Sequence, residues 1–290
     1  MSRHAKSRNR LGSLLMYLVL IAWTAFTVFP LYWTVITSVK TPLAVNEGPF
    51  YFPFIDFKPT LDAWVGIFTR EFSGDMVTRP FGNSVVVGLT SAVLAVILGS
   101  LAAYGLTRFT YRLGKIGNKD IAFWILSQRM LPPIATVIPL FIVFKTLRIL
   151  DTRISLILAY TMFNLPFSVW LMRDFFASLP REVEECALVD GCTPFQVFYR
   201  IALPLSTPGL VATFIFCLIF AWNEFLFALV LTFSKGQTMP LLIAGQNFQR
   251  GPQWWDISAM ALLTIFPVLL LALLVERYIV RGLTLGAVKE

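Results

Sequence analysis

Long apolar runs constrain this chain more than any other feature. Several runs reach or exceed about 20 residues, which is enough for a helix to cross a bilayer. Charged residues make up only 14% of the chain, whereas hydrophobic residues make up 57%; a soluble domain carries about 25% charged residues. Because lipid offers no hydrogen-bond partner to the backbone, spanning segments of this kind form helices. The sequence therefore predicts an all-α integral membrane protein.

Six apolar runs are the predicted spans: residues 11–39, 81–109, 121–144, 154–171, 209–233 and 257–275. The first is too long for the apolar part of a signal peptide, and no small-x-small cleavage site closes it. Lys and Arg gather before the first run and after the second, fourth and sixth runs, which predicts that both termini are cytoplasmic. We expect residues 1–79 to hold the tail, first span and outer loop, and residues 80–290 to hold a five-helix core.

Two spans carry unusual residues. Small residues recur every fourth position of the second span, at Ser91, Ala95, Gly99 and Ala103, which predicts close helix packing. The third span contains Arg129 and the pair Pro132–Pro133, so we expect a distorted helix there. An arginine inside a span faces protein or water, which leaves Arg129 either a structural anchor or a pathway residue.

Residues 178–208 separate the fourth and fifth spans and have the pattern of two short helices joined by a turn. Pro180 fits the first turn of a helix, and Gly191 fits its left-handed end. Thr193 and Gln196 form a capping box for a second helix. One face of that second helix is predicted to carry Phe195, Phe198, Ile201 and Ala202. The segment is therefore predicted to be a rigid body that contacts a partner in water.

The same segment resembles the cytoplasmic loop signature of binding-protein-dependent ABC importer permeases of the type I fold. The matching residues are Glu185, Ala187, Asp190, Gly191, Ile201, Leu203 and Pro204; Cys186 stands where the family usually has Ala. In that family the loop forms coupling helices that dock into a cleft on the ATPase. The resemblance implies a coupling site composed of Glu184, Glu185, Cys186, Ala187, Asp190, Gly191, Phe195, Phe198, Ile201 and Pro204.

Four further stretches resemble the carbohydrate-uptake branch, in particular the second permease of maltose-type systems. They are AAYGLTRF (102–109), RMLPPIATVIPLF (129–141), WNEF (222–225) and the tail GLTLGAVKE (282–290). The resemblance implies import of a sugar or related polyhydroxy compound across a bacterial inner membrane by alternating access. It also implies three partners: a second permease subunit, a cytoplasmic ATPase dimer, and a periplasmic or lipid-anchored solute-binding protein. ATP and Mg²⁺ would be bound by the ATPase, and no cofactor by this chain.

Polar residues within the apolar runs are candidates for the substrate pathway, because such residues are rare and functional in membranes. They are Tyr160, Asn164, Asn223 and Glu224. Between the last two spans, Gln246, Asn247 and Gln249 lie where the related permease inserts a loop toward its binding protein. The resemblance implies that these three side chains contact the binding protein or its ligand, although a simple solvated turn is an equal alternative.

Several functions lack their sequence signatures. No Gly-rich phosphate loop is present, and the single histidine, His4, lies in the basic tail, so no catalytic set is predicted. Cys186, Cys192 and Cys217 do not have metal-ligand spacing, and we expect neither a disulfide nor a zinc site. The positive charge reports topology rather than nucleic-acid binding.

Two alternatives stay open. Permeases for polyamines, phosphate or amino acids share the loop signature, so the cargo could belong to one of those classes. A self-contained channel or secondary carrier would need no docking loop and often shows two matched halves with broken helices; the sequence has no such symmetry.

Overall fold

The computed structural model describes residues 10–72, 76–246 and 251–284, and helices account for most of them. Two short antiparallel strands, β1 (Arg112–Leu113) and β2 (Ile116–Gly117), form a small hairpin. Contacts divide the chain into two compact units. One comprises Met1–Arg70 and Gln246–Leu263, and the other comprises Glu71–Gly245 and Thr264–Glu290.

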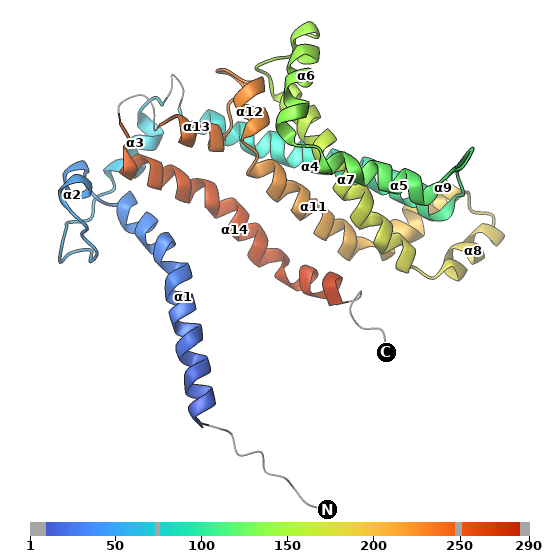
Figure 1. The fold of residues 1–290 in the computed structure, drawn as a ribbon, viewed down its shortest axis with the longest axis horizontal. Coiled ribbons are helices and arrows are strands. Elements are labelled where there is room, and N and C mark those ends of the chain that lie inside the picture. The colour runs from blue at the N-terminus through green and yellow to red at the C-terminus, as the bar shows by residue number, and fades with distance from the viewer. Residues whose placement is uncertain (1–9, 73–75, 247–250, 285–290) are drawn as a thin grey trace, which may run out of the picture. The chain divides into compact units, whose positions relative to one another are not determined.

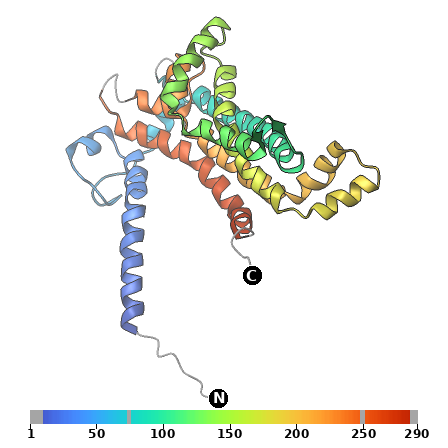
Figure 2. The ribbon, with the colours of Figure 1, turned by 45° about the vertical axis from the view of Figure 1, so that its right-hand side comes forward.

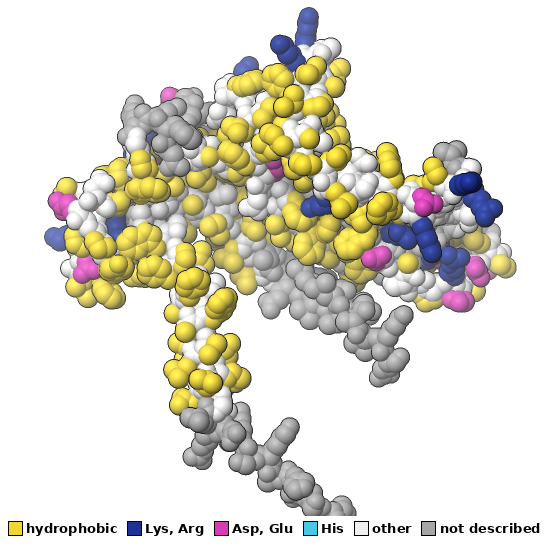
Figure 3. Space-filling view, in the orientation of Figure 1, with side chains coloured by type: hydrophobic (Ala, Val, Ile, Leu, Met, Phe, Trp, Pro, Cys, Tyr) yellow, Lys and Arg dark blue, Asp and Glu magenta, His cyan; other side chains and the backbone are white. Residues whose placement is uncertain are grey.

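The first unit contains α1 (Arg10–Ser38), α2 (Pro42–Glu47), α3 (Asp62–Thr69) and the first turns of α14 (Trp254–Thr284). From Leu14 to Leu31 the apolar side chains of α1 are exposed on all sides of the helix; Trp23 and Phe26, for example, are 69% and 75% exposed, whereas Ile36 in the last turn is buried. Figure 3 shows this helix as a rod covered by hydrophobic side chains. A helix that is apolar on all sides fits a lipid environment or the surface of another membrane helix.

The second unit is built on long helices, and Figures 1 and 2 show their arrangement. Its helices are α4 (Thr78–Arg108), α5 (Asn118–Ser127), the 3₁₀ turn η1 (Gln128–Met130), α6 (Pro133–Thr146), α7 (Arg153–Ser178), α8 (Arg181–Val189), α9 (Pro194–Val197), the π-helical turn η2 (Phe198–Ala202), α10 (Leu203–Leu205), α11 (Thr207–Trp222), α12 (Leu226–Leu231), α13 (Met239–Gly245) and the part of α14 from Thr264 on. The central packing is made by α4, α7 and α11.

Small residues allow α4 to pack closely against its neighbours. Ser91, Ala95 and Ala103 have no exposed surface. A Cβ added at Gly99 would overlap the side chain of Ser168 on α7. The predicted close-packing role of this four-residue repeat is therefore confirmed.

The third span is broken where the two prolines stand. The helix pair 118–130 and 133–146 is bent by 90°. Pro132 precedes α6 and Pro133 is its first residue, as expected because proline lacks the N–H needed inside a helix. The predicted distortion is thus confirmed, and it is a complete break rather than a kink.

The fifth span also differs from the single helix expected over residues 209–233. Helix α11 ends at Trp222, and a second helix, α12, begins at Leu226. Glu224 lies in the break, where its carboxylate accepts hydrogen bonds from the backbone N–H groups of Phe227 (2.9 Å) and Ala228 (3.3 Å). The carboxylate thus satisfies two of the free N–H groups at the start of α12.

Asp151 fastens the turn between α6 and α7 to the loop after α12. Its carboxylate accepts backbone hydrogen bonds from Phe233, Ser234, Lys235 and Gly236 at 2.9–3.1 Å. It also accepts a bond from the Ser234 hydroxyl at 3.0 Å. Partial burial raises the pKa of Asp151, but the four N–H donors outweigh that effect and leave its pKa far below the ordinary value.

Two contacts decide how often the bent segments cross the membrane. Arg108 at the end of α4 pairs with Glu184 beyond α7, so both residues lie on one side. The 26 residues of α7 cross once, and α5–α6 must therefore also cross rather than turn back. Asp151, which precedes α7, binds Phe233 beyond α12, and the same reasoning makes α11–α12 one crossing. Four helices, α1, α4, α7 and α14, are each long and apolar enough to cross a membrane, and the two broken segments bring the number to the six predicted spans.

Candidate coupling site

The segment 178–208 forms the compact arm that extends beyond α7 in Figures 1 and 2. It contains α8, α9, η2 and α10. Charged side chains of both signs gather around this end in Figure 3, in contrast to the apolar surface of the spans. The arm therefore has the surface of a segment that meets water or a protein partner.

The arm is held in place by an ion pair between α8 and α4. Glu184 is 6% exposed, and its carboxylate accepts bonds from the Arg108 guanidinium at 2.7–3.0 Å. The Tyr104 hydroxyl donates to the same carboxylate at 2.9 Å, and Arg108 Nη2 also donates to the carbonyl of Phe176 at 2.8 Å. Several donors thus compensate the buried charge, as burial of a carboxylate requires.

Aromatic packing reinforces this anchor. The ring of Phe198 in η2 lies 4.9 Å from the ring of Tyr104 and 6.1 Å from that of Phe176. Phe198 and Ala202 are buried in one cluster with residues of α4 and α7. The arm therefore belongs to the hydrophobic core of the second unit and is not a loosely attached loop.

The turn inside the arm has the expected geometry. Gly191 has φ +88°, a left-handed conformation that favours glycine. The Thr193 hydroxyl accepts from the N–H of Gln196 (3.3 Å), whose side chain accepts from the N–H of Thr193 (2.8 Å). The predicted glycine end and capping box are confirmed. Pro180 lies one residue before α8 rather than inside its first turn.

The predicted coupling residues separate into two groups. Glu184, Ala187 and Phe198 are buried within the chain, and Ile201 is half-buried. The exposed group consists of Glu185, Cys186, Asp190, Gly191, Phe195 and Pro204. The predicted apolar face of the second helix thus includes Phe198 and Ala202, whereas Phe195 is 65% exposed and turns its ring to the surface.

Arg108 and Tyr104 complete the anchor and were not among the predicted site residues. They lie four residues apart at the end of α4, a spacing that places two side chains on one face of a helix. That spacing and the family-like stretch 102–109 are the sequence signals for them. Glu184 is 76 positions from Arg108 and 80 from Tyr104, and nothing in the local sequence indicates the pairing.

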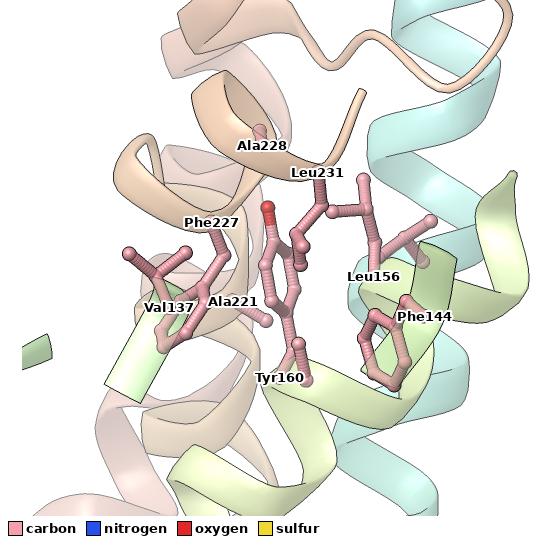
Figure 4. Close-up of a cluster of buried hydrophobic side chains, with 10 residues drawn as sticks. Val137, Phe144, Leu156, Tyr160, Ala221, Phe227, Ala228 and Leu231 are labelled. Atoms are coloured by element: carbon pink, nitrogen blue, oxygen red, sulfur yellow. The ribbon is translucent and has the colours of Figure 1, made fainter. Parts of the chain in front are cut away.

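Two of the predicted pathway residues come together, because the Tyr160 side chain interacts with the carboxylate of Glu224. Tyr160 is 2% and Asn164 1% exposed. The Asn164 amide donates to the carbonyl of Cys217 on α11 at 3.2 Å. In Figure 4 the Tyr160 hydroxyl points toward α12, beside Phe227 and Leu231. Asn223 is exposed at the break after α11, and its amide donates to the carbonyl of Ile219 at 2.8 Å.

Of the three residues predicted to contact the binding protein, Gln246 belongs to the described part of the chain. Gln246 lies half-buried in a turn directly after α13. Asn247 and Gln249 lie outside the described residues. In the tail, α14 extends to Thr284, and the rest of the stretch 282–290 is also outside the described part.

Comparisons with known proteins agree with this architecture. The sequence pattern of the family described as binding-protein-dependent transport system inner membrane component matches residues 95–284. A probable ABC transporter permease of Sinorhizobium fredii is 37% identical over 93% of this chain and 95% of its own length. The trehalose transport system permease SugB of Mycobacterium tuberculosis is 36% identical over 91% and 93%.

A solved structure shares the fold. The crystal structure of a bacterial ABC transporter that imports the acidic polysaccharide alginate contains a chain that superposes with a TM-score of 0.73 at 20% identity. The match covers 96% of this chain and 98% of that one. Six spans, an anchored two-helix arm and these sequence matches lead to one conclusion: this chain belongs to the family of binding-protein-dependent transport system inner membrane components, the permeases of ABC importers.

Proposed function

We propose that this permease moves a sugar or related polyhydroxy compound across a bacterial inner membrane. The observation that carries the cargo class is the similarity over more than nine-tenths of both chains to a permease named for trehalose transport. The chain supplies the path through the membrane. ATP and Mg²⁺ are bound and used by a separate ATPase dimer, and a second permease subunit completes the pore.

The arm 178–208 couples ATP hydrolysis to movement of the spans. Its exposed group, Glu185, Cys186, Asp190, Gly191, Phe195 and Pro204, contacts the ATPase. Its buried group passes the motion inward, because Glu184 is bound to α4 through Arg108. When ATP closes the ATPase dimer, the docked arm moves with it and the spans turn outward. Hydrolysis then restores the inward-facing state.

The outer and inner ends serve the other two partners. A solute-binding protein delivers the cargo at the outer face, where Gln246, Asn247 and Gln249 contact it. Tyr160, Asn164, Asn223 and Glu224 line or support the cargo path. Both termini lie in the cytoplasm, and the stretch 282–290 reaches the ATPase dimer.

Purification of the tagged chain from its native membrane in mild detergent tests the proposal. An ATPase and a second permease are expected to co-purify. Trehalose or maltose, added with the solute-binding protein, is expected to stimulate ATP hydrolysis by the complex. Stimulation by a polyamine, phosphate or an amino acid instead would contradict the cargo class. Recovery of the chain without an ATPase would contradict the coupling role.

A further inference from the structure

Arg129 lies in a cage of three phenylalanine rings at the break of the third span. Its guanidinium carbon is 5.4 Å from the ring centroid of Phe163, 5.0 Å from Phe167 and 4.4 Å from Phe220. The first two rings belong to α7 and the third to α11. Each ring within about 6 Å stabilises a cation by its electron-rich face. The cage therefore compensates the charge and holds the side chain in one place.

The cage does not satisfy the hydrogen bonds of the guanidinium. An arginine has five N–H donors and no acceptor. The Nη1 of Arg129 is buried and has no hydrogen-bond partner among the described residues, and the Cys217 thiol is close enough to interact with the guanidinium. A buried donor without an acceptor loses the hydrogen bonds that it made with water, and the loss is larger when the group is charged. The three rings thus stabilise the charge of Arg129, but its buried N–H donor has no acceptor.

The backbone beside Arg129 indicates where the missing acceptors come from. α5 contributes 10 residues before the break and α6 contributes 14 after it, so the break lies about midway along the span. Irregular backbone at such depth is tolerated only where protein covers it or where it lines a water-filled cavity. Met130, the next residue, is 80% exposed in this chain.

A cavity of about 250 Å³ adjoins the break. Its lining is mostly apolar and does not include Arg129; its polar side chains are Trp124, Gln128 and Thr136. The Gln128 amide and the Thr136 hydroxyl already donate to the carbonyls of Trp124 and Pro133, which leaves their oxygens free to accept. Phe163 belongs both to this lining and to the cage of Arg129. A few polar groups among apolar walls are typical of small-molecule sites. The cavity volume is slightly below the usual range for such sites, so it fits one part of a solute.

We propose that Arg129 is a solute contact: its guanidinium donates hydrogen bonds to oxygen atoms of the sugar as it passes the break in the third span. The inference rests on the proposed function, because it takes the polyhydroxy cargo as the source of acceptors. Hydroxyl, ring and glycosidic oxygens all accept such bonds, and a carboxylate on the sugar accepts two at once.

Thiol protection tests this contact directly. A variant with Cys186, Cys192 and Cys217 changed to Ser receives Arg129→Cys as its single thiol. The whole importer is placed in nanodiscs, and a charged methanethiosulfonate reagent is added with and without the sugar that stimulates the wild-type complex. We expect the thiol at position 129 to react, and the sugar to slow the reaction severalfold.

Two matched positions define the result. Lys115→Cys in the exposed hairpin turn should react at one rate with or without sugar, and Phe123→Cys on the exposed apolar side of α5 should not react. If position 129 is unreactive while position 115 reacts, or if sugar leaves its rate unchanged, the proposal is overturned. Gln128→Cys keeps Arg129 and probes the same cavity if the Arg129→Cys complex does not assemble; protection there supports the proposal, and unprotected or absent reaction overturns it.

A second measurement separates a solute contact from a structural clamp. Arg129→Met should lower sugar uptake per ATP hydrolysed about tenfold, the value of one charge-assisted hydrogen bond, while Arg129→Lys retains a donor and recovers part of the loss. Equal uptake by both variants and the wild type would overturn the proposal, as would equal loss in both. If no sugar stimulates even the wild-type complex, the proposed function itself fails, which is a distinct result.

Discussion

The carboxylate of Glu184 is surrounded by its own chain, and its removal from water depends on Arg108. We expect Arg108→Met to lower the free energy of unfolding by about 3–5 kcal/mol, because it leaves a buried charge without its partner. Denaturant titration of the purified chain in detergent would measure the change. The double variant Arg108→Met with Glu184→Leu should recover much of the loss, since it removes both charges.

Glu182→Gln is the matched control for this ion pair. Glu182 is exposed on the same helix, and its substitution should change the unfolding free energy by no more than about 0.5 kcal/mol. If Arg108→Met unfolds at the same denaturant concentration as Glu182→Gln, the ion pair does not anchor the arm.

Asp151 gives the chain a pH-dependent contribution to stability. Its pKa is lower in the folded state, where burial opposes but four backbone N–H donors favour the charged form. Its contribution is therefore fully present above the unfolded pKa of about 3.9 and is lost as pH falls through the depressed folded value. We expect Asp151→Asn to destabilise the chain by about 1–3 kcal/mol at neutral pH.

The pH profile provides the check on Asp151. The difference in unfolding free energy between wild type and Asp151→Asn should shrink as the pH is lowered below about 4. Asp174→Asn removes an exposed carboxylate of α7 and should give no comparable difference at any pH. A gap between Asp151→Asn and the wild type that is constant with pH would show that the charge of Asp151 is not the cause.

At the residue scale, the sequence predicts groups whose partners are close along the chain. The capping box of Thr193 and Gln196 and the left-handed Gly191 are of this kind, because three or four residues contain all the interacting atoms. Glu184 is different: it stands among three glutamates, and only contact with α4 decides which of them is buried. Arg108 and Tyr104 escaped prediction for the same reason.

Among the elements, the turn between α8 and α9 is the most sensitive to substitution. Gly191 has φ +88° and open space around it, so a side chain there strains the backbone without a clash. A left-handed residue other than glycine costs about 1–2 kcal/mol. We expect Gly191→Asp to reduce sugar uptake per ATP hydrolysed while membrane insertion is unchanged, as measured in proteoliposomes of the whole importer.

Gly114→Asp is the matched control for the turn. Gly114 also has a positive φ, +63°, with open space around it, but it lies in the hairpin between β1 and β2. The substitution places similar strain and the same charge in a different turn, and coupling should be retained. Equal losses for both variants would contradict a specific role for the turn at Gly191.

The breaks in the third and fifth spans differ in how well they can be predicted from the sequence. Pro132 and Pro133 mark the break of the third span, because proline cannot continue a helix. The break after Trp222 contains neither proline nor glycine. It is stabilised by the Glu224 carboxylate, which binds the first N–H groups of α12. A glutamate in an apolar run can be a residue of the substrate pathway as well as a helix cap, so this break could not be predicted from the sequence.

At the scale of the whole molecule, six crossings follow from contacts that tie loops together. We expect single cysteines at Lys115 and Arg148 to be labelled from opposite sides by a membrane-impermeant thiol reagent, because α5–α6 crosses between them. A cysteine at Lys235 should be labelled from the same side as Arg148. The experiment uses intact cells and inverted vesicles, with the native cysteines changed to Ser. Labelling of positions 115 and 148 from one side would show that α5–α6 turns back.

The number and order of the spans could be predicted because each span is marked by the length and apolar composition of its own run of residues. Their packing could not, apart from the small residues of α4. The long-range contacts of Asp151 and Glu184 join residues that are 76–85 positions apart, and such pairings have no local signature.

The buried and exposed faces of the arm 178–208 are also subject to different constraints during evolution. The inner face, with Glu184 and Phe198, is matched to α4 and α7 of its own chain, so a change there requires a compensating change in the same gene. The outer face, with Glu185, Asp190 and Phe195, is exposed, so a change there needs no compensating change elsewhere in the same chain. Under the coupling role that we propose for the exposed face, such a permease can exchange one ATPase for another through a few surface substitutions and keep its membrane architecture unchanged.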